Sequence, residues 1–298
     1  MMIINNRKYW QVLSHFMMIV MASLSVLPFI LLIVASFTDN DWALANGFSY
    51  FPKKLSLDAY RYISGSWQMI GKAYLMTIVV AFLGTLLSIL ITTMLSYTLS
   101  YTDLPGVKFL TFMTVFTMLF SGGLVASFYI WSNVFNIRDT IWALIFPNIM
   151  MNAFNVILVK NYYQTSVPLS LLEAARIDGC GETKIFWSIV FPLSKPIIAT
   201  IGLMTAIFYW NDWTNGLYYL TQKGGSRYYT IQLVLNQINS SINFLTTNAT
   251  ALSGNTTSLP STTARMAIAV IGIIPIMIAY PFFQKYFTKG ITIGAVKG

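Results

Sequence analysis

The chain has 298 residues, of which 56% are hydrophobic and only 9% carry a charge, and its mean hydropathy is +0.65. Soluble domains carry about 25% charged residues, so this chain has too little charge to cover a surface that faces water. The composition excludes a soluble enzyme, a soluble nucleic-acid-binding domain and a disordered scaffold. It predicts an integral membrane protein.

The net charge of +9 comes from 18 basic and 9 acidic residues. The basic residues form no run and no aromatic-basic patch, so they do not indicate nucleic acid as a partner. They are better explained as residues that flank membrane spans. Cys180 is the single cysteine and His15 the single histidine, so the sequence predicts no intrachain disulfide and no Cys/His metal site.

Several stretches are long and apolar enough to cross a bilayer, which takes roughly 20 residues per helix. In chain order, the six stretches are Phe16–Phe37, Ala73–Tyr97, Phe109–Trp131, Trp142–Lys160, Ile185–Trp210 and Met266–Phe287. The first resembles a signal peptide after Arg7 and Lys8, but it is too long and lacks a small-residue cleavage site. We therefore expect an all-α polytopic membrane protein whose six transmembrane helices occupy residues 16–287, between an N-terminal segment, 1–15, and a tail, 288–298.

The distribution of positive charge indicates the orientation of these helices. Six spans place both termini on one side, and ten basic residues fall on that side: Arg7, Lys8, Lys108, Lys160, Arg176, Lys184, Lys195, Lys285, Lys289 and Lys297. The other eight of the 18 are spread over longer segments, so the density predicts cytoplasmic termini. Segment 213–263 is then extracellular. Its uncharged part, Asn236–Thr263, fits either a flexible connection or a contact site on the outer surface.

Three asparagines interrupt the fourth predicted span. Asn148, Asn152 and Asn155 are spaced i, i+4, i+7, which would place them on one face of a continuous helix. Amides at membrane depth are costly to leave unpaired, so these three are candidates for lining a solute path. The alternative is that they bond to neighbouring helices and only hold the bundle together.

The segment between the fourth and fifth spans, 168–184, predicts a short helix at the cytoplasmic surface. Ser170 can cap it with Glu173 as its capping-box partner, and Arg176 lies i+3 from Glu173. Ala174–Ala175 gives a small-residue surface that a partner could approach, and Gly179 can end the helix in a sharp turn. A short helix joined rigidly to a membrane span suits the transmission of force from a soluble partner. A helix that lies on lipid is disfavoured, because the segment carries no Trp, Phe or Lys-rich face.

The same segment resembles the signature of a known family. The residues in question are Glu173-Ala174-Ala175, three residues, Gly179, nine residues and Ile189-x-Phe191-Pro192. They look like the EAA loop of ABC importer permeases, with Phe191 in place of the usual leucine. Further similarity lies in Phe120-Ser-Gly-Gly123, Trp210-Asn211-Asp212-Trp213 and the tail that ends in Gly298. From the second predicted span onward the chain is similar to MalG-type permeases of carbohydrate importers, in particular the complex-oligosaccharide branch.

The resemblance implies a permease subunit in the plasma membrane of a bacterium, which couples the closure of an ATPase to alternating access. Its partners would be a second, homologous permease subunit, two cytoplasmic ABC ATPase subunits and an extracellular solute-binding lipoprotein, and its solute an oligosaccharide. The ATPase would bind ATP and magnesium, because this chain has no GxxxxGKS/T loop and needs no cofactor of its own. By resemblance, the residues that dock on the ATPase are Glu173, Ala174, Ala175 and Gly179, with Arg176 and Asp178 in support.

A row of polar and aromatic residues closes the fifth span. The row is Tyr209, Trp210, Asn211, Asp212 and Trp213. Aromatic rings stack on the C–H faces of sugars and amides pair with hydroxyls, so this row is a second candidate for solute contacts, and an interfacial aromatic belt is its alternative. The spans carry no dense cationic lining, which favours an uncharged oligosaccharide. An acidic sugar stays open, because it could meet Lys72, Arg138 or Arg265 near the outer mouth.

Other classes of transporter also stay open. ABC importer permeases for amino acids, peptides or ions share the EAA loop, and the Lys-Gly tail favours the sugar branch by resemblance only. An ion-coupled secondary transporter would need carboxylates at mid-membrane. No acidic residue lies in the core of a predicted span, since Asp212 sits at the end of the fifth. A membrane-embedded enzyme would need a His/Asp/Glu constellation, which the sequence lacks.

Overall fold

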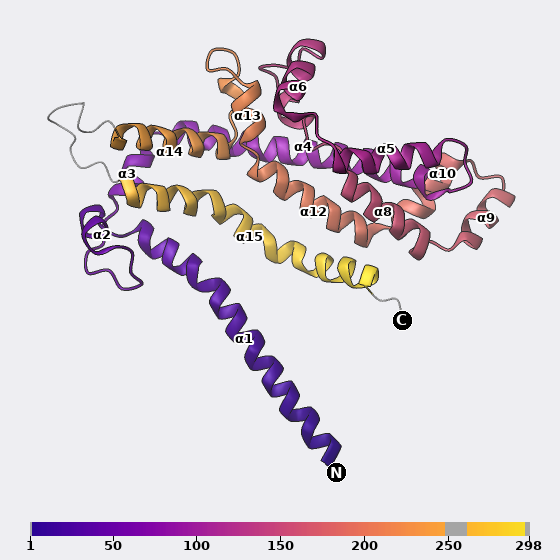
Figure 1. The fold of residues 1–298 in the computed structure, drawn as a ribbon, viewed down its shortest axis with the longest axis horizontal. Coiled ribbons are helices and arrows are strands. Elements are labelled where there is room, and N and C mark those ends of the chain that lie inside the picture. Colours follow the sequence, from indigo (N-terminus) through magenta and orange to yellow (C-terminus); the bar gives the residue numbers. More distant parts are fainter. Residues whose placement is uncertain (1, 248–260, 296–298) are drawn as a thin grey trace. The chain divides into compact units, whose positions relative to one another are not determined.

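A computed structural model describes residues 2–247 and 261–295, and within these ranges the chain is almost entirely helical (Figure 1). The longer helices are α1 (Met2–Ser36), α4 (Trp67–Ser100), α5 (Val107–Leu119), α8 (Ala153–Ser166), α9 (Leu169–Ile177), α12 (Lys195–Asn211), α14 (Ile231–Thr247) and α15 (Ser261–Ala295). The short helices are α2 (Asn40–Asn46), α3 (Asp58–Ser64), α6 (Gly123–Tyr129), α7 (Trp142–Ile145), α10 (Glu182–Ile185), α11 (Phe191–Leu193) and α13 (Thr214–Tyr219). Two π-helical turns, η1 (Ile130–Val134) and η2 (Phe186–Val190), and a 3-10 turn, η3 (Ser226–Tyr228), complete the described elements. The all-α class is confirmed.

The chain divides into two compact units, which we describe separately. The first unit comprises 1–68 and 235–275, and the second comprises 69–234 and 276–298. In the first unit, α1 exposes apolar side chains along the membrane-length stretch Tyr9–Ser36. A helix that is hydrophobic all round must be covered by lipid or by another polypeptide.

The end of α1 is fixed to the segment that follows it in the first unit. The hydroxyls of Ser36 and Tyr60 are hydrogen-bonded at 2.8 Å, and the ring of Phe37 stacks on that of Tyr60 at 4.9 Å. Asp39 caps α2 by accepting a hydrogen bond from the amide of Trp42 at 2.9 Å. These contacts hold residues 36–60 as an ordered structure next to a long apolar helix.

In the second unit, α4 is the helix against which the other elements pack. Its buried face is rich in small residues such as Ala73, Gly84 and Ser88, which permit close approach of neighbouring helices. Ser96 of α4 donates a hydrogen bond to the carbonyl of Val156 in α8 at 2.9 Å. At Gly84, a Cβ would lie 2.4 Å from the ring of Tyr209 in α12, so only glycine fits there. The sequence of α4 therefore allows several short helices to approach it closely.

The six predicted membrane spans are not all continuous helices. Two stretches among the described residues, Tyr9–Ser36 and Trp67–Ser100, are long and apolar enough to cross a membrane as single rods. The third predicted span is wrong as a straight helix, because α5 and Gly123–Val134 meet at 120°. The fifth is likewise bent by 80° between Leu193 and Lys195. With each bent pair counted as one span, up to four helices qualify.

Local sequence explains both bends. Gly123 has φ +81°, a left-handed conformation that glycine adopts without steric cost and that breaks the helix after α5. Pro192 and Pro196 flank the second bend, and a proline inside a helix removes a backbone donor. The sixth predicted span, Met266–Phe287, lies within α15, which continues as one helix through all of these residues.

The fourth predicted span, Trp142–Lys160, is wrong as a single helix. It consists of α7 and α8, which are separated by seven non-helical positions, 146–152. Pro147 lies in this interruption, and Asn148 follows it with φ +64°. Asn152 then caps α8, since its side-chain oxygen accepts a hydrogen bond from the amide of Asn155 at 3.2 Å. Because most residues of this span are apolar, hydropathy alone does not reveal the break.

Segment 213–263 is not a simple loop. It contains α13, η3 and α14, and Ile231, Leu233 and Val234 of α14 are buried. The amide of Ile231 donates to the hydroxyl of Thr77 at 2.8 Å, which fixes the start of α14 against α4. Residues 248–260 of the predicted polar stretch, Asn236–Thr263, lie outside the described residues. Lys297 of the predicted tail lies outside them too.

Candidate functional site

The predicted cytoplasmic helix exists as α9, and its start differs from the prediction. Ser170 is not the N-cap, because Pro168 occupies that position with φ −64° and ψ 125° and the helix begins at Leu169. An extended proline immediately before the first helical residue is a common way to begin a helix. The prediction of a capping box between Ser170 and Glu173 is therefore wrong.

The end of α9 is as predicted. Gly179 has φ +80°, and its amide bonds to the carbonyl of Arg176 at 2.9 Å. The amide of Cys180 reaches back to the carbonyl of Ala175 at 3.0 Å. These two bonds form a Schellman motif, which needs a left-handed residue and so favours glycine. The chain direction after α9 is consequently fixed by the backbone.

The two faces of α9 have different surroundings. Leu172 and Ala175 are buried in an apolar cluster that also contains Tyr97 of α4 and Phe186 and Val190 of η2. Ala175 is only 8% exposed, so the prediction that it forms part of a partner-facing small-residue surface is wrong.

The remaining residues of the predicted docking set, Glu173, Ala174, Arg176, Asp178 and Gly179, are exposed. Ile177 is 86% exposed, and sequence reasoning did not single it out. The exposed side of α9 therefore carries apolar as well as charged side chains.

Arg176 connects α9 to α10. Its Nε lies 2.8 Å from Oε1 of Glu182, so the predicted pairing with Glu173 is replaced by one six residues along the chain. The other carboxylate oxygen of Glu182 accepts a hydrogen bond from the Tyr97 hydroxyl of α4 at 2.6 Å. Tyr101 donates to the Tyr97 hydroxyl at 2.8 Å, and the Arg176 guanidinium lies 5.1 Å from the centre of the Tyr101 ring.

These four residues, Tyr97, Tyr101, Arg176 and Glu182, form one connected group, which we call the α4–α9 strut. It joins the short helix α9 to the last turn of the longest helix of the second unit. The side chains of Arg176 and Glu182 are 37% and 56% exposed, so solvent weakens their attraction. The sequence did not predict the strut, because 85 positions separate Tyr97 from Glu182.

An apolar cluster extends the connection from α9 toward α12. The rings of Tyr97 and Phe186 lie 5.3 Å apart, and Phe186 packs in turn with Trp187 and Phe191 at the start of the bent helix pair. Ile197 of α12 is buried in the same cluster. Side chains in continuous contact therefore connect α9 to both α4 and α12.

The three asparagines do not share a helix face. Asn148 is exposed in the turn before α8, and Asn152 serves as the cap of α8. Asn155 is buried, and its amide nitrogen lies 3.4 Å from the hydroxyl of Thr205 in α12. For Asn155, the alternative of a bond between helices matches the structure. The prediction of a continuous amide stripe is wrong, because the helix starts only at Ala153.

The row at the end of α12 is also divided by its surroundings. Tyr209 is buried and donates a hydrogen bond to the carbonyl of Ile145 at 2.8 Å, which is a structural contact. Asp212 accepts hydrogen bonds from the amides of Thr214 and Asn215 at 3.0 and 3.3 Å. It therefore fixes the start of α13.

The other members of the row have different contacts. The ring of Trp210 lies 6.2 Å from that of Tyr74, Asn211 accepts from Gln232 at 3.5 Å, and Trp213 is 39% exposed. Of the row, Asn211 and Trp213 are therefore the exposed side chains. Within the described residues, no three His, Cys, Asp or Glu side chains gather as metal ligands would.

Comparison with known proteins identifies relatives over the whole length. Residues 104–293 match the family model for the binding-protein-dependent transport system inner membrane component. The polygalacturonan/rhamnogalacturonan transport system permease protein YtcP of Bacillus subtilis (strain 168) is 40% identical over 98% of this chain and 99% of its own. The arabinooligosaccharides transport system permease protein AraQ of Halalkalibacterium halodurans is 30% identical over 93% of each chain.

A solved structure is similar as well. It is that of a bacterial ABC transporter involved in the import of the acidic polysaccharide alginate. One of its chains is 27% identical to this one, with a TM-score of 0.74 and coverage of 94% of this chain and 97% of the other.

Proposed function

The chain belongs to the family of binding-protein-dependent transport system inner membrane components, and we propose that it is a permease subunit of an ATP-driven importer of oligosaccharides. As a member of this family it is an integral inner membrane protein and a transport subunit, with ATP hydrolysed by a separate protein. The relatives named for polygalacturonan, rhamnogalacturonan and arabinooligosaccharides support a carbohydrate as the solute.

The proposal includes the assembly implied by the EAA resemblance. A second permease subunit, two cytoplasmic ATPase subunits and an extracellular solute-binding lipoprotein would complete the importer, with both termini of this chain in the cytoplasm of a bacterium. The exposed apolar surface of α1 supports an assembly of this kind, because the first unit leaves α1 uncovered. Lipid and a neighbouring permease helix are the surroundings that such a surface fits.

We assign coupling to α9, and the α4–α9 strut is the observation that carries this assignment. The exposed Glu173, Ala174 and Ile177 would contact the ATPase, with Arg176, Asp178 and Gly179 in support. Because ATP binds the two conformations of the ATPase with different affinities, its binding shifts the equilibrium between them. The strut and the cluster beneath α9 would pass this displacement to α4 and α12.

Two substitutions test this assignment. Gly179→Pro removes the amide that bonds to Arg176 and cannot adopt φ +80°, so α9 would lose its fixed direction. Glu173→Lys reverses a charge on the exposed face and leaves the buried face unchanged. We expect both variants to insert into the membrane normally and to lose at least tenfold in ATP-driven uptake.

The measurement is sugar uptake together with co-purification of the ATPase from native membranes. Glu182→Lys is unsuitable as a control because it breaks the strut, so Asp103→Lys, an exposed charge reversal in the turn after α4, serves instead. Normal uptake by both test variants would refute the assignment of coupling to α9. Isolation of an active complex without any ATPase would refute the importer itself.

A further inference from the structure

Two segments of the second unit fold together beside α4, and we call residues 123–147 and 212–230 the side lobe. It contains α6, η1, α7, α13 and η3. In Figure 1, α6 and α13 project together on the same side of α4. The ring of Phe128 in α6 stacks on that of Tyr219 in α13 at 5.7 Å and 17°, which joins the two segments directly.

The base of the side lobe packs at the middle of α4. Gly84 lies 17 residues after the first residue of α4 and 16 before the last, so it is about 25 Å from either end. It touches Tyr209, whose hydroxyl bonds to Ile145, and Val80 is buried with Leu220 in the same cluster. Wherever a hydrocarbon core of about 30 Å lies along a helix of about 50 Å, it includes the midpoint. The base of the lobe is therefore at membrane depth.

Short helices separated by non-helical segments indicate what surrounds the lobe at this depth. Non-helical backbone occurs there only where protein buries it or where it lines a water-filled cavity. The side lobe also carries three exposed cations, Arg138, Lys223 and Arg227. Charged side chains at this depth do not face lipid, and they mark solute pathways. The exposed surface of the side lobe is therefore turned toward water or toward another polypeptide.

The two carboxylates of the side lobe are already engaged. Asp139 accepts hydrogen bonds from the amide and the hydroxyl of Thr221, the latter at 2.8 Å, and Asp212 is bound by two amides of α13. Gly225 permits this approach, since a Cβ there would lie 2.5 Å from a carboxylate oxygen of Asp139. Among the described residues, Arg138 forms no ion pair. Its positive charge is therefore available to a ligand.

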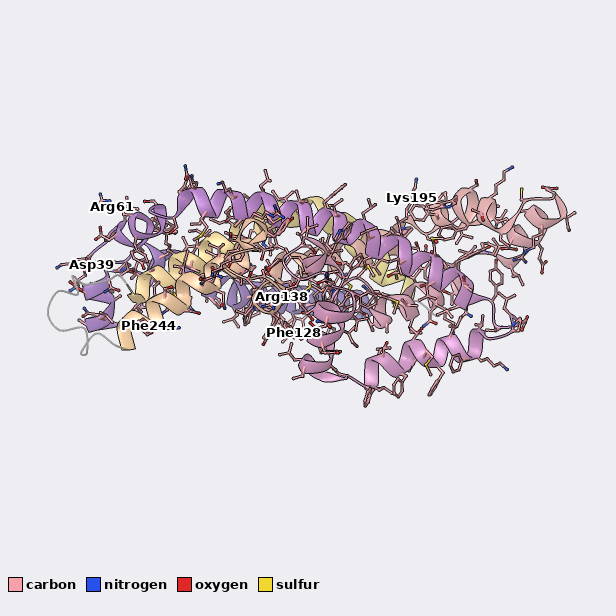
Figure 2. The ribbon with its side chains drawn as sticks, turned by 90° about the horizontal axis from the view of Figure 1, so that it is seen from above. Asp39, Arg61, Phe128, Arg138, Lys195 and Phe244 are labelled. Carbon is pink, nitrogen blue, oxygen red and sulfur yellow. The ribbon has the colours of Figure 1, made fainter. Side chains whose placement is uncertain are left out.

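Arg138 is placed on an aromatic surface. Its guanidinium lies 5.9 Å from the centre of the Phe128 ring, and Figure 2 shows the two residues next to each other. Phe128 rests in turn on the buried Tyr219. A planar guanidinium offers a fork of N–H donors that matches a carboxylate, and the stacked ring beneath it restricts the positions that the fork can take. A uronate unit of an oligosaccharide carries such a carboxylate.

We propose that Arg138 and Phe128 form a contact site for a uronate unit of the transported oligosaccharide. The inference rests on the proposed importer function and adds the charge class of its solute. It reverses the expectation of an uncharged sugar, which followed from the absence of cations in the helical spans. The relevant cation lies outside those helices, in a lobe whose base packs at the middle of α4.

The test uses the whole importer, isolated with its partner subunits and binding protein and reconstituted in vesicles of phosphatidylcholine. ATP-driven uptake of trigalacturonate is compared with that of its trimethyl ester, which has the same length and no charge. The test variant is Arg138→Gln, with Arg138→Lys as the conservative variant. Arg61→Gln, an exposed arginine of the first unit that is paired with Asp58 at 3.3 Å, is the matched control.

We expect Arg138→Gln to lower uptake of trigalacturonate about tenfold, which is about 1.4 kcal/mol, and to change uptake of the ester less than twofold. Arg138→Lys should lose about threefold, because a single ammonium replaces the fork. Arg61→Gln should behave as wild type with both sugars.

Three results would overturn the inference while the importer function stands. In the first, the wild-type importer takes up the ester but not trigalacturonate. In the second, Arg138→Gln lowers uptake of both sugars equally. In the third, Arg138→Gln lowers uptake only after phosphatidylglycerol is added to the vesicles. The second would indicate that Arg138 pairs with another subunit, and the third that it binds a lipid headgroup. Uptake of neither sugar by the wild type, together with no sugar-stimulated ATP hydrolysis, would refute the proposed function.

Discussion

Removal of the Tyr97 hydroxyl is the sharpest perturbation of the coupling path. In the strut this hydroxyl donates to Glu182 at 2.6 Å and accepts from Tyr101 at 2.8 Å, so Tyr97→Phe deletes two hydrogen bonds and keeps the ring packing against Phe186. A hydrogen bond to a charged group contributes roughly 1.5–3 kcal/mol when it is shielded. The Glu182 side chain is 56% exposed, which lowers the value expected here to about 1 kcal/mol. The Arg176–Glu182 ion pair alone contributes less, since exposed pairs give about 0.2–1 kcal/mol.

The assay is the number of sugar molecules imported per ATP hydrolysed by the reconstituted importer. A loss of about 1 kcal/mol in the link corresponds to about a fivefold drop in this ratio for Tyr97→Phe, with ATP hydrolysis itself retained. Glu182→Gln should give a similar drop, because it removes the charge that binds both Tyr97 and Arg176.

A double-mutant cycle distinguishes a working strut from two independent effects. If Tyr97 and Glu182 act through one another, the double variant should be no worse than the more impaired single variant. Tyr62→Phe, a partly exposed tyrosine of the first unit, controls for the loss of a hydroxyl elsewhere. If the fold-losses of the two single variants multiply in the double variant, the two residues act independently. That result, or an unchanged ratio of sugar to ATP in both single variants, would show that the strut does not couple α9 to α4.

Two further predictions concern the packing that holds the side lobe at α4. Gly84→Ala places a Cβ 2.4 Å from the ring of Tyr209, so we expect thermal unfolding of the detergent-solubilised importer several degrees lower, and an unchanged melting curve would contradict this close packing. Asp139→Ala removes the two hydrogen bonds that Thr221 donates to Asp139, and so weakens the attachment of the two segments of the side lobe to each other. Uptake of trigalacturonate and of its ester should then fall by the same factor, in contrast to Arg138→Gln, and a selective loss of the acid would mean that Asp139 orients the sugar directly.

Several features could be derived from the sequence because they depend on composition or on adjacent residues. Low charge and long apolar runs predicted helices in a membrane, and α1 and α4 follow these runs closely. The residues of segment 168–184 predicted a short helix ended by Gly179, and the Schellman bonds at that residue depend only on neighbouring positions. The family comparison confirms the resemblance to carbohydrate importer permeases.

The helix breaks were partly legible in the sequence. Pro147 followed by Asn148, and the prolines around Ser194, are turn-forming combinations that an apolar window averages away. If these combinations are read as helix breaks, the sequence no longer predicts that Asn148, Asn152 and Asn155 share one helix face. The π-helical turns η1 and η2 have no comparable signal, since their residues are ordinary apolar and aromatic ones.

The sequence by itself determined that the chain is a membrane permease with a short helix that ends at Gly179, because hydrophobicity, motif spacing and glycine chemistry act over short distances along the chain. Only the tertiary structure decided that Tyr97 bonds to Glu182, that Ala175 is buried, and that Arg138 lies on Phe128 in a lobe joined to α13. These facts depend on contacts between segments up to 91 positions apart, such as Phe128 and Tyr219. No local pattern specifies which distant side chains will meet, since that choice is made when the helices pack.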